Sequence, residues 1–443
     1  MDNIVPALYG SYGKYVNTLR MLPLDLDGLI PAQRRVLIVI NKLARNRFVK
    51  CKKIVGETTG TYHPHGDCYS TVVQMYYQGF IEKQGNFGDT VGLFPSSPAA
   101  PRYTECKSSK FLNEILEYID CADWDFIETD EKEPIFIPTV FPMFLINKYF
   151  YSGIGFGCRC LAPCYLPKDL YNRLMYLLEK GKKVIIKPFS DCDILSPDKD
   201  LEELLTTGKA TITFRGKVEK IKDECKLIVH SVPYGKKINT MIQSEKRDKT
   251  KDVSRFFTCG DVGFIDQSKN GKTMITFDIR RTRDKYKIFE EFSKLIEDFL
   301  TASVSFDTIV VDRDGNAFRK PIDNLLLDTY KLYTKITKTK FIKDKKQVQE
   351  EIDDLEALKT IRPHIKNYLE CEDIKSSIEN ISKKTKISVE TISRLFSKYR
   401  IQKLFTVKTD TSDLVSEVDK IDKNIENLEK IVIDKYNSII KLI

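Results

Sequence analysis

The sequence predicts a multidomain α+β fold, because the residue pattern changes twice along the chain. The first third carries apolar residues at helical spacing together with a strongly basic segment. Between about residues 141 and 322, short runs alternate apolar and polar side chains, which is typical of strands. From 322 to 443 glycine is absent and apolar residues return at helical spacing. Since 443 residues exceed one typical core, the chain should divide into roughly two to four domains.

The composition argues against several classes of protein. Apolar residues make up 42% of the chain and charged residues 30%, which is ordinary for a folded protein. No run of about 18 apolar residues occurs, so no membrane span is expected, and the N-terminus lacks the basic segment of a secretory signal. Eleven cysteines in so long a chain favour free thiols in a reducing compartment such as the cytoplasm. The net charge of +9 is compatible with a polyanionic partner.

Three helices are predicted near the N-terminus, after a short arm. Pro31 can occupy the first turn of a helix that runs to about residue 47. A second helix is expected over about 51–59, and a third from an N-cap at Asp67 to about residue 78. Consecutive short helices of this kind are typical of helix-turn-helix units.

A basic segment overlaps the first two of these helices. From Gly28 to Gly56 the chain holds eight Lys and Arg residues and no Asp or Glu. They are Arg34, Arg35, Lys42, Arg45, Arg47, Lys50, Lys52 and Lys53. A solvated basic face is the ordinary explanation of an isolated charge run. Beside a helix-turn-helix pattern, the run instead fits a winged-helix unit in which Arg34 and Arg35 contact DNA phosphates without reading base sequence.

Three short segments contain residue types that carry chemistry: Tyr62–Asp67 (YHPHGD), Gln84–Gly88 (QGNFG) and Ala99–Glu105 (AAPRYTE). Pro101 lacks an N–H group and pushes the residue before it toward extended geometry. Tyr103 is therefore expected on a turn or loop, where functional side chains are often presented. One tyrosine among 21 is ordinarily a packing residue, so no segment is decisive alone.

In this order, the three segments resemble the breakage-reunion subunit of type IIA DNA topoisomerases. This family comprises the A subunits of DNA gyrase and of topoisomerase IV, which carry YHPHGD, GQGNFG and RYTE in the same order. Upstream, the segment from Asp27 to Arg35 matches the family's DGLxPxxRR element. As a subunit without an evident DNA-wrapping domain, the chain looks most like the medium subunit of T-even-type bacteriophage topoisomerases.

The resemblance implies roles for individual residues. Tyr103 would be the nucleophile that attacks a DNA phosphodiester and leaves a 5′-phosphotyrosyl link. Arg102 and Arg20 are suited to neutralising the oxygens of the attacked phosphate. DNA contacts are implied for His63, His65 and Ile154, the last in an SGIxxG loop whose isoleucine wedges between base pairs.

The resemblance also implies four parts: an N-terminal arm (1–20) that reaches the partner subunit, a winged-helix (CAP-like) cleavage domain (21–140), a β-rich tower domain (141–322) and a coiled coil with a C-terminal dimer gate (323–443). An apolar seam at alternating +4 and +3 spacing, from Leu414 to Ile443, is typical of a coiled coil. We therefore expect a homodimer joined through the C-terminal gate.

The expected partners are double-stranded DNA and a second kind of subunit. A phosphodiester displacement normally uses a divalent metal ion on the leaving oxygen, and the sequence shows no acidic cluster with a convincing metal arrangement. No cofactor is expected in this chain; Mg²⁺ and ATP would reside on an ATPase/TOPRIM subunit. The assembled enzyme is expected to relax and decatenate DNA rather than supercoil it. The compartment would be the cytoplasm, or the host cytoplasm if the source is viral.

Two other functions are open on the residues alone. A non-catalytic, dimeric winged-helix DNA-binding protein explains the basic helices and the seam, and the lack of a covalent protein–DNA adduct would identify it. A zinc-dependent nuclease is the third interpretation, because two sets of residues have ligand chemistry. The sets are His63, His65, Cys68 and Cys51, and Cys158, Cys160 and Cys164.

Overall fold

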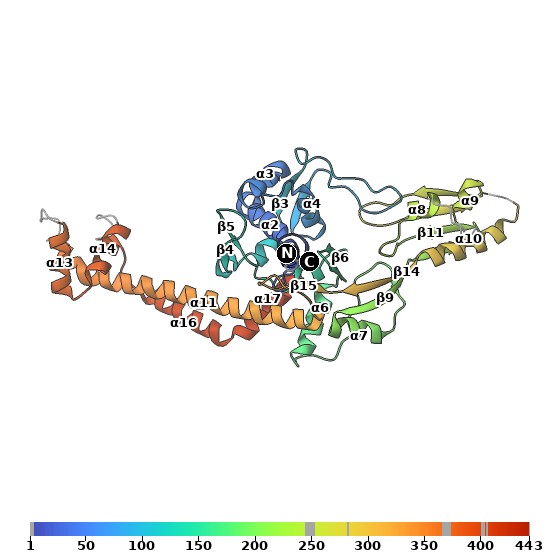
Figure 1. Cartoon of the computed structure of the whole chain (residues 1–443). Helices are drawn as coiled ribbons and strands as arrows, with labels where there is room; N and C mark the ends of the chain where they lie inside the picture. Colours follow the sequence, from blue (N-terminus) through green and yellow to red (C-terminus); the bar gives the residue numbers. More distant parts are fainter. Residues whose placement is uncertain are drawn as a thin grey trace. The chain divides into compact units, whose positions relative to one another are not determined.

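The computed structural model of the chain contains both helices and sheets, as Figure 1 shows, which confirms the α+β class. It describes residues 4–243, 253–280, 283–365, 374–399, 404 and 406–442. The chain separates into two compact units, Met1–Tyr333 with Tyr436–Ile443, and Thr334–Lys435. The finer division into four domains stays a prediction.

The N-terminal part of the first unit is organised around helix α2 (Pro31–Ala44). Pro31 opens the helix where its missing N–H group costs nothing, and the Gln33 side chain accepts a hydrogen bond from the Ile30 N–H group (3.1 Å). Every residue from Gln33 to Ile40 is buried. Helix α2 is therefore a central helix, not a surface one.

Short helices and a small sheet surround α2. In chain order the elements are α1 (Ile4–Val16), the π-turn η1 (Asn17–Met21), β1 (Val49–Lys50), α3 (Cys51–Thr61), α4 (Tyr69–Tyr77), β2 (Ile81–Gln84), β3 (Glu105–Ser108) and α5 (Lys110–Ile115). The strands form an antiparallel sheet in the order β1-β3-β2. The three predicted helices are confirmed, but α2 ends at Ala44 and α4 begins at Tyr69. Asp67 accepts a hydrogen bond from the Tyr69 N–H group (2.8 Å) and lies one residue before the N-cap.

The rest of the first unit is rich in strands, as predicted. One antiparallel sheet has the order β6-β7-β14-β9-β8, with strands Tyr151–Ile154, Arg159–Ala162, Thr301–Asp307, Lys209–Arg215 and Asp193–Ile194. A second has the order β10-β11-β13-β12, with strands Val218–Ile221, Lys226–Val229, Ile275–Ile279 and Val262–Asp266. The hairpin of β4 (Trp124–Phe126) and β5 (Lys132–Pro134) lies between the small sheet and these two larger sheets along the chain.

The second sheet packs on α10 (Lys285–Phe299) through aromatic rings. The ring centroids of Phe277 in β13 and Phe292 in α10 are 5.5 Å apart, and both residues are fully buried. Strand β9 contains the predicted alternation at 211–214, whereas β13 begins at Ile275, two residues later than its pattern suggested. The predicted turn at 312–315 joins β15 (Ile309–Val311) to β16 (Ala317–Arg319). The lysine-rich stretch at 246–251 lies outside the described residues.

The second unit is helical. Its helices are α13 (Ile374–Thr385), α14 (Val389–Lys398) and α16 (Ser412–Glu426), with most of α11 (Ile322–Ile361) and the first part of α17 (Leu428–Ile440). Helices α11 and α16 run side by side (Figure 1), and Lys345 of α11 donates to both carboxylate oxygens of Asp422 of α16 (2.6 and 2.7 Å). Ile421, Val432 and Ile439 of the predicted seam are buried. The seam is not one helix, because Asn427 interrupts it between α16 and α17.

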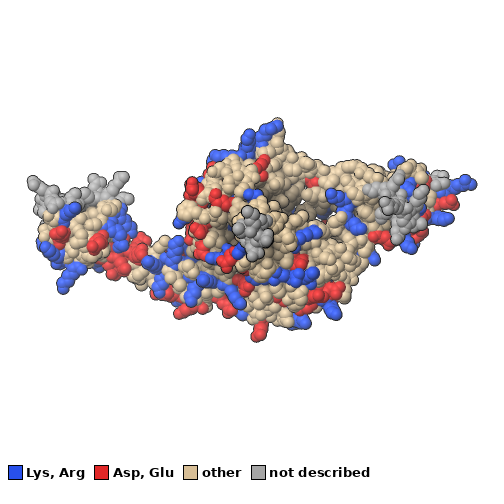
Figure 2. All heavy atoms as spheres, in the orientation of Figure 1, with Lys and Arg blue, Asp and Glu red and all other residues tan. Residues whose placement is uncertain are grey.

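Charge on the surface is mixed. On the face shown in Figure 2, Lys and Arg side chains are interspersed with Asp and Glu rather than gathered in one patch. Within the described part of the chain, no helix is long and apolar enough to cross a membrane.

Candidate active site

Tyr103 lies at the end of the loop that connects β2 to β3, and the residue is 62% exposed. The Tyr103 N–H group donates to the Ala100 carbonyl (2.9 Å), which closes a turn around Pro101. The Arg102 guanidinium lies 4.6 Å from the centroid of the Tyr103 ring. The predicted presentation of Tyr103 on a turn is therefore confirmed.

The base of this turn is fixed by buried contacts. Thr104 is fully buried, and its carbonyl accepts from the Cys51 N–H group (2.9 Å) at the start of α3. The Tyr69 hydroxyl donates to the Ala99 carbonyl (2.6 Å) and lies 2.9 Å from Thr104 Oγ1. The turn is thus held on both sides while the phenol of Tyr103 stays in solvent, a geometry suited to a large polymeric substrate.

The Gln84–Gly88 segment packs against the same turn. Gly85 has a φ of +94°, and a Cβ atom placed there would lie 3.0 Å from the Tyr103 carbonyl oxygen. Gly88 has a φ of +82°, and its Cβ would lie 2.6 Å from the Ser96 carbonyl oxygen. Both positions need glycine because of left-handed backbone and close contact. The structure therefore brings the second and third segments of the sequence together.

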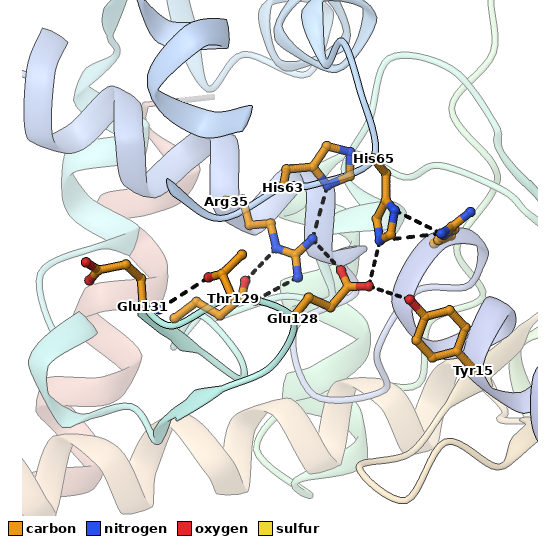
Figure 3. A network of polar contacts seen from close by, with 9 residues as sticks. Tyr15, Arg35, His63, His65, Glu128, Thr129 and Glu131 are labelled. Atoms are coloured by element: carbon orange, nitrogen blue, oxygen red, sulfur yellow. Dashed lines mark hydrogen bonds and ion pairs between the residues drawn. The ribbon is translucent and has the colours of Figure 1, made fainter. Parts of the chain in front are cut away.

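A second cluster of polar side chains forms around Glu128, in the turn between β4 and β5 (Figure 3). Glu128 Oε1 accepts hydrogen bonds from the Tyr15 hydroxyl (2.7 Å) and from His65 Nε2 (2.6 Å). Glu128 Oε2 lies 2.8 Å from Arg35 Nη1, an ion pair by distance rather than a well-aligned hydrogen bond. The first segment, Tyr62–Asp67, contributes its histidines to this cluster.

Arginine side chains determine which ring nitrogen of each histidine accepts a hydrogen bond. Arg20 Nη2 lies 2.9 Å from His65 Nδ1, and Arg35 Nη1 lies 3.1 Å from His63 Nδ1. A guanidinium only donates hydrogen bonds, so both Nδ1 atoms must accept and each ring carries its proton on Nε2. Burial and the neighbouring Arg35 charge lower the pKa of His63, which keeps that ring neutral.

Glu128 is ionised at every physiological pH. Burial would raise the pKa of this carboxyl group, but the contacts with His65, Tyr15 and Arg35 outweigh burial and lower the pKa to about 2. The hydrogen bond to Glu128 in turn raises the pKa of the Tyr15 phenol. Arg20 Nε is buried and has no hydrogen-bond partner among the described residues. Leaving such a donor unsatisfied costs about 1–3 kcal/mol.

The prediction that Arg34 and Arg35 belong to an exposed basic surface is wrong. Arg34 is 5% exposed and Arg35 is 1% exposed. Arg34 Nη1 donates to the fully buried carboxylate of Asp27 (3.1 Å). Arg35 binds Glu133 with two hydrogen bonds of 2.7 Å. Buried carboxylates hold both side chains, because an arginine in the interior needs an anionic partner.

The remaining basic residues of the segment lie at the surface. Lys42 pairs with Glu57 (3.0 Å) and Lys50 with Glu105 (2.8 Å). The others are exposed: Arg45, Arg47, Lys52 and Lys53. The surface residues of this segment, and not Arg34 or Arg35, are therefore available to a polyanion, and these four lack an acidic partner among the ion pairs of the described residues.

Ile154 is 71% exposed at the end of β6. The loop that follows β6 is hydrogen-bonded to Asn17, whose side-chain amide donates to the Phe156 carbonyl (3.1 Å). The Gly155 N–H group donates to the Cys158 carbonyl (2.8 Å). The Ile154 side chain is therefore an exposed apolar group on a hairpin of fixed backbone, and it can pack against a bound molecule.

The candidate zinc ligands do not form a metal site. Across the described ranges, no group of three or more His, Cys, Asp and Glu side chains is placed to hold a metal ion. His63 and His65 are instead engaged by arginines, and Cys51 lies beside Cys106. Burial raises the pKa of Cys160 and of Cys164 to about 12, so both are thiols.

Sequence reasoning missed Glu128, Tyr15 and Glu133. The only signal for the two glutamates was the acidic stretch at 125–133, which follows the basic helices and has five Asp and Glu residues, and Tyr15 is an ordinary apolar-face position of the N-terminal arm. Nothing local links this stretch to the histidines, since Glu128 is 63 residues from His65. Arg20 and His65, in contrast, were both singled out, and the structure places them in contact.

Comparison with known proteins places these features in a family. The family model for the A subunit of DNA gyrase/topoisomerase IV matches residues 20–442. The chain is 27% identical over 337 residues to the DNA topoisomerase 4 A subunit of Streptococcus pyogenes serotype M6, which covers 70% of this chain and 40% of that protein. It is 35% identical over 258 residues to the DNA gyrase A subunit of Campylobacter jejuni (53% and 29% covered) and 30% identical over 318 residues to that of Neisseria gonorrhoeae (65% and 33%). The chain thus matches less than half the length of these relatives.

Proposed function

The chain belongs to the family of DNA gyrase and topoisomerase IV A subunits, and on that premise we propose that it is the DNA cleavage and religation subunit of a type II DNA topoisomerase. One Tyr103 from each protomer of a homodimer attacks a phosphodiester in each strand. Its phenolic oxygen bonds to phosphorus as the bond to the 3′ oxygen breaks, which leaves a transient 5′-phosphotyrosyl link and a free 3′-hydroxyl group that takes up the proton lost by the phenol. A second duplex passes through the break before the link is reversed.

One observation carries the proposal: Tyr103 is exposed on a turn whose backbone is fixed, with Arg102 over its ring. A phenol is a weak nucleophile because its ordinary pKa is about 10. Cationic groups nearby make its attack easier by neutralising charge that builds on the phosphate. Arg102 lies over the Tyr103 ring and supplies that charge, and we assign the same role to Arg20 on the family resemblance.

The DNA-binding surface follows from the exposed groups. The helices α2 to α4 with the β1-β3-β2 sheet correspond in this proposal to a winged-helix cleavage domain. The two larger sheets correspond to a tower domain from which Ile154 inserts between base pairs. DNA phosphates are contacted by the exposed side chains of Arg45, Arg47, Lys52 and Lys53. His63 and His65 lie next to the DNA backbone near the cleaved bond.

Partners complete the enzyme. Among the described residues no group of three or more His, Cys, Asp and Glu side chains is placed to hold a metal ion, and no step through a metal is derived for this chain. We place Mg²⁺ and ATP on an ATPase/TOPRIM subunit, and the homodimer contact at the helical C-terminal gate. Relaxation and decatenation rather than supercoiling, a bacteriophage source and a cytoplasmic site of action stay predictions.

The test is a covalent adduct with Tyr103. The chain, reconstituted with a TOPRIM-bearing partner and end-labelled duplex, should give a protein–DNA adduct on a denaturing gel. Tyr103→Phe removes only the hydroxyl and should abolish the adduct while DNA binding persists. Tyr286→Phe is the control, because Tyr286 is equally exposed at 68% but lies on α10.

An adduct that survives in Tyr103→Phe would refute the assignment of the nucleophile. If the wild-type chain binds DNA yet gives no adduct with any TOPRIM partner, the non-catalytic winged-helix function is favoured instead. Strong double-strand cutting by the purified chain alone would contradict the division of the enzyme between two subunits.

A further inference from the structure

Glu128 has more polar contacts than a structural ion pair needs. Its side chain is 6% exposed, and three groups from different parts of the chain converge on it: Tyr15 of α1, Arg35 of α2 and His65. Figure 3 shows the carboxylate between the His65 ring and the Tyr15 hydroxyl. None of the three sequence segments that identify the site contains this residue.

The charge of Arg35 does not explain Glu128. Arg35 Nε and Nη2 already form a two-pronged pair with Glu133, with both distances at 2.7 Å. Burying a second carboxylate beside the same guanidinium costs desolvation free energy unless other groups donate hydrogen bonds to that carboxylate. Those donors are His65 Nε2 and the Tyr15 hydroxyl, at 2.6 and 2.7 Å. The carboxylate therefore acts mainly on His65 and Tyr15.

The bond from His65 to Glu128 selects one tautomer of the ring. With its proton on Nε2 and directed at Glu128, His65 keeps the lone pair of Nδ1 available. Arg20 Nη2 lies 2.9 Å from that Nδ1 atom and 3.4 Å from Nε2, so Nδ1 is the nearer acceptor. A chain of contacts thus runs from Glu128 through His65 to the arginine whose buried Nε has no partner among the described residues.

We propose that Glu128 is a positioning residue of the cleavage site, which fixes the tautomer and orientation of His65 and through them aims the Arg20 guanidinium at the attacked phosphate. The aiming of Arg20 at a phosphate rests on the proposed function, whereas the orientation of His65 by Glu128 does not. Glu128 itself touches no reacting atom, and no group is consumed or transferred at it.

The first experiment measures the tautomer directly, without DNA or partner. The chain has four histidines, so ¹⁵N labelling of the imidazole rings gives few signals, and His65→Gln assigns the one from His65. The wild-type His65 signal should show a protonated Nε2 and an unprotonated Nδ1. Glu128→Ala should convert it to a mixture of tautomers, whereas Tyr15→Phe, which removes another donor from the same carboxylate, should not.

The second experiment is a double-mutant cycle on the rate of single-turnover cleavage with the TOPRIM partner. Glu128→Gln should slow cleavage by about 10- to 100-fold, the loss expected when a catalytic group is misaligned, with DNA affinity changed less than about 2-fold. In an Arg20→Ala background the same substitution should cost less than about 3-fold, since the group it positions is gone. Glu128→Asp, which keeps the charge, should recover part of the rate.

The outcomes separate the two proposals. Equal fold losses from Glu128→Gln with and without Arg20, or an unchanged His65 tautomer in Glu128→Ala, would overturn the positioning role and leave Glu128 as a structural contact. A wild-type chain that forms no Tyr103 adduct would overturn the proposed function, and the tautomer of His65 would still decide whether Glu128 orients that ring.

Discussion

Replacing Arg34 by methionine should destabilise the protein without weakening its contact with DNA. The substitution keeps an unbranched side chain of similar length but removes Nη1, which donates to both oxygens of Asp27 (3.1 and 3.3 Å) and to the Leu29 carbonyl (2.8 Å). Asp27 is fully buried and would keep only the N–H groups of Leu29 and Ile137, each at 2.9 Å.

The expected loss is about 3–5 kcal/mol at pH 7, because breaking a buried ion pair leaves one charge without compensation. Burial raises the pKa of Asp27, and Arg34 opposes that shift. Without Arg34 the pKa of Asp27 rises further, so the folded protein can hold Asp27 in its neutral form at low pH. The penalty should therefore be largest above the folded-state pKa of Asp27 and shrink as the pH falls through that pKa. A second substitution, Asp27→Asn, should recover part of the stability.

Two measurements check this prediction. Urea unfolding followed by the fluorescence of Trp124, the chain's single tryptophan, reports on the unit that contains Arg34. DNA affinity measured at several salt concentrations reports phosphate contacts, because the logarithm of the affinity falls with the logarithm of the salt concentration by about 0.9 for each phosphate neutralised. Arg34→Met should lower the urea midpoint and leave the slope unchanged.

The paired variant Lys52→Ala/Lys53→Ala serves as the control, since both side chains are exposed on α3. It should leave the urea midpoint unchanged and flatten the slope by up to about two units if each lysine contacts one phosphate. If Arg34→Met instead unfolds at the wild-type midpoint and flattens the salt slope, the buried pairing of Arg34 is refuted and its side chain faces DNA.

Three other substitutions probe contacts at the turn and at Glu128. Gly85→Ala should reduce the rate of adduct formation by at least about 10-fold, because the new Cβ lies 3.0 Å from the Tyr103 carbonyl oxygen at a φ of +94°; a wild-type rate would show that the turn yields freely. Tyr69→Phe should cost about 1–2 kcal/mol in urea unfolding, since the buried Thr104 hydroxyl and the Ala99 carbonyl lose a partner; an unchanged midpoint would contradict it. Glu128→Gln should remove part of the acid sensitivity of unfolding. The depressed pKa of about 2 means that the Glu128 carboxylate stabilises the wild type above about pH 4.5 and ceases to do so as the pH falls toward 2, and identical acid unfolding of variant and wild type would argue against this.

The sequence was sufficient wherever the determining interactions are local. Tyr103 could be placed on an exposed turn because Pro101 restricts the backbone within two residues of it. The alternation at 211–214 and the seam at the C-terminus reflect the periods of a strand and a helix, which any short window reveals. Within the described part of the seam, which excludes Ile443, the helix is interrupted at Asn427 although the apolar spacing continues.

The tertiary structure decided which charged residues face solvent. Arg34 and Arg35 have the same composition signal as Lys52 and Lys53, and charge counting treats all four alike. The structure separates them because α2 is enclosed on all sides along Gln33–Ile40.

The partners that keep Arg35 and His65 in place come from far along the chain. Glu133 lies 98 residues from Arg35, and Glu128 lies 63 residues from His65. A buried cation is tolerated only where packing brings a carboxylate to within hydrogen-bond distance. That distance is set by how the β4–β5 turn packs against α1 and α2, and no local pattern in either segment encodes it.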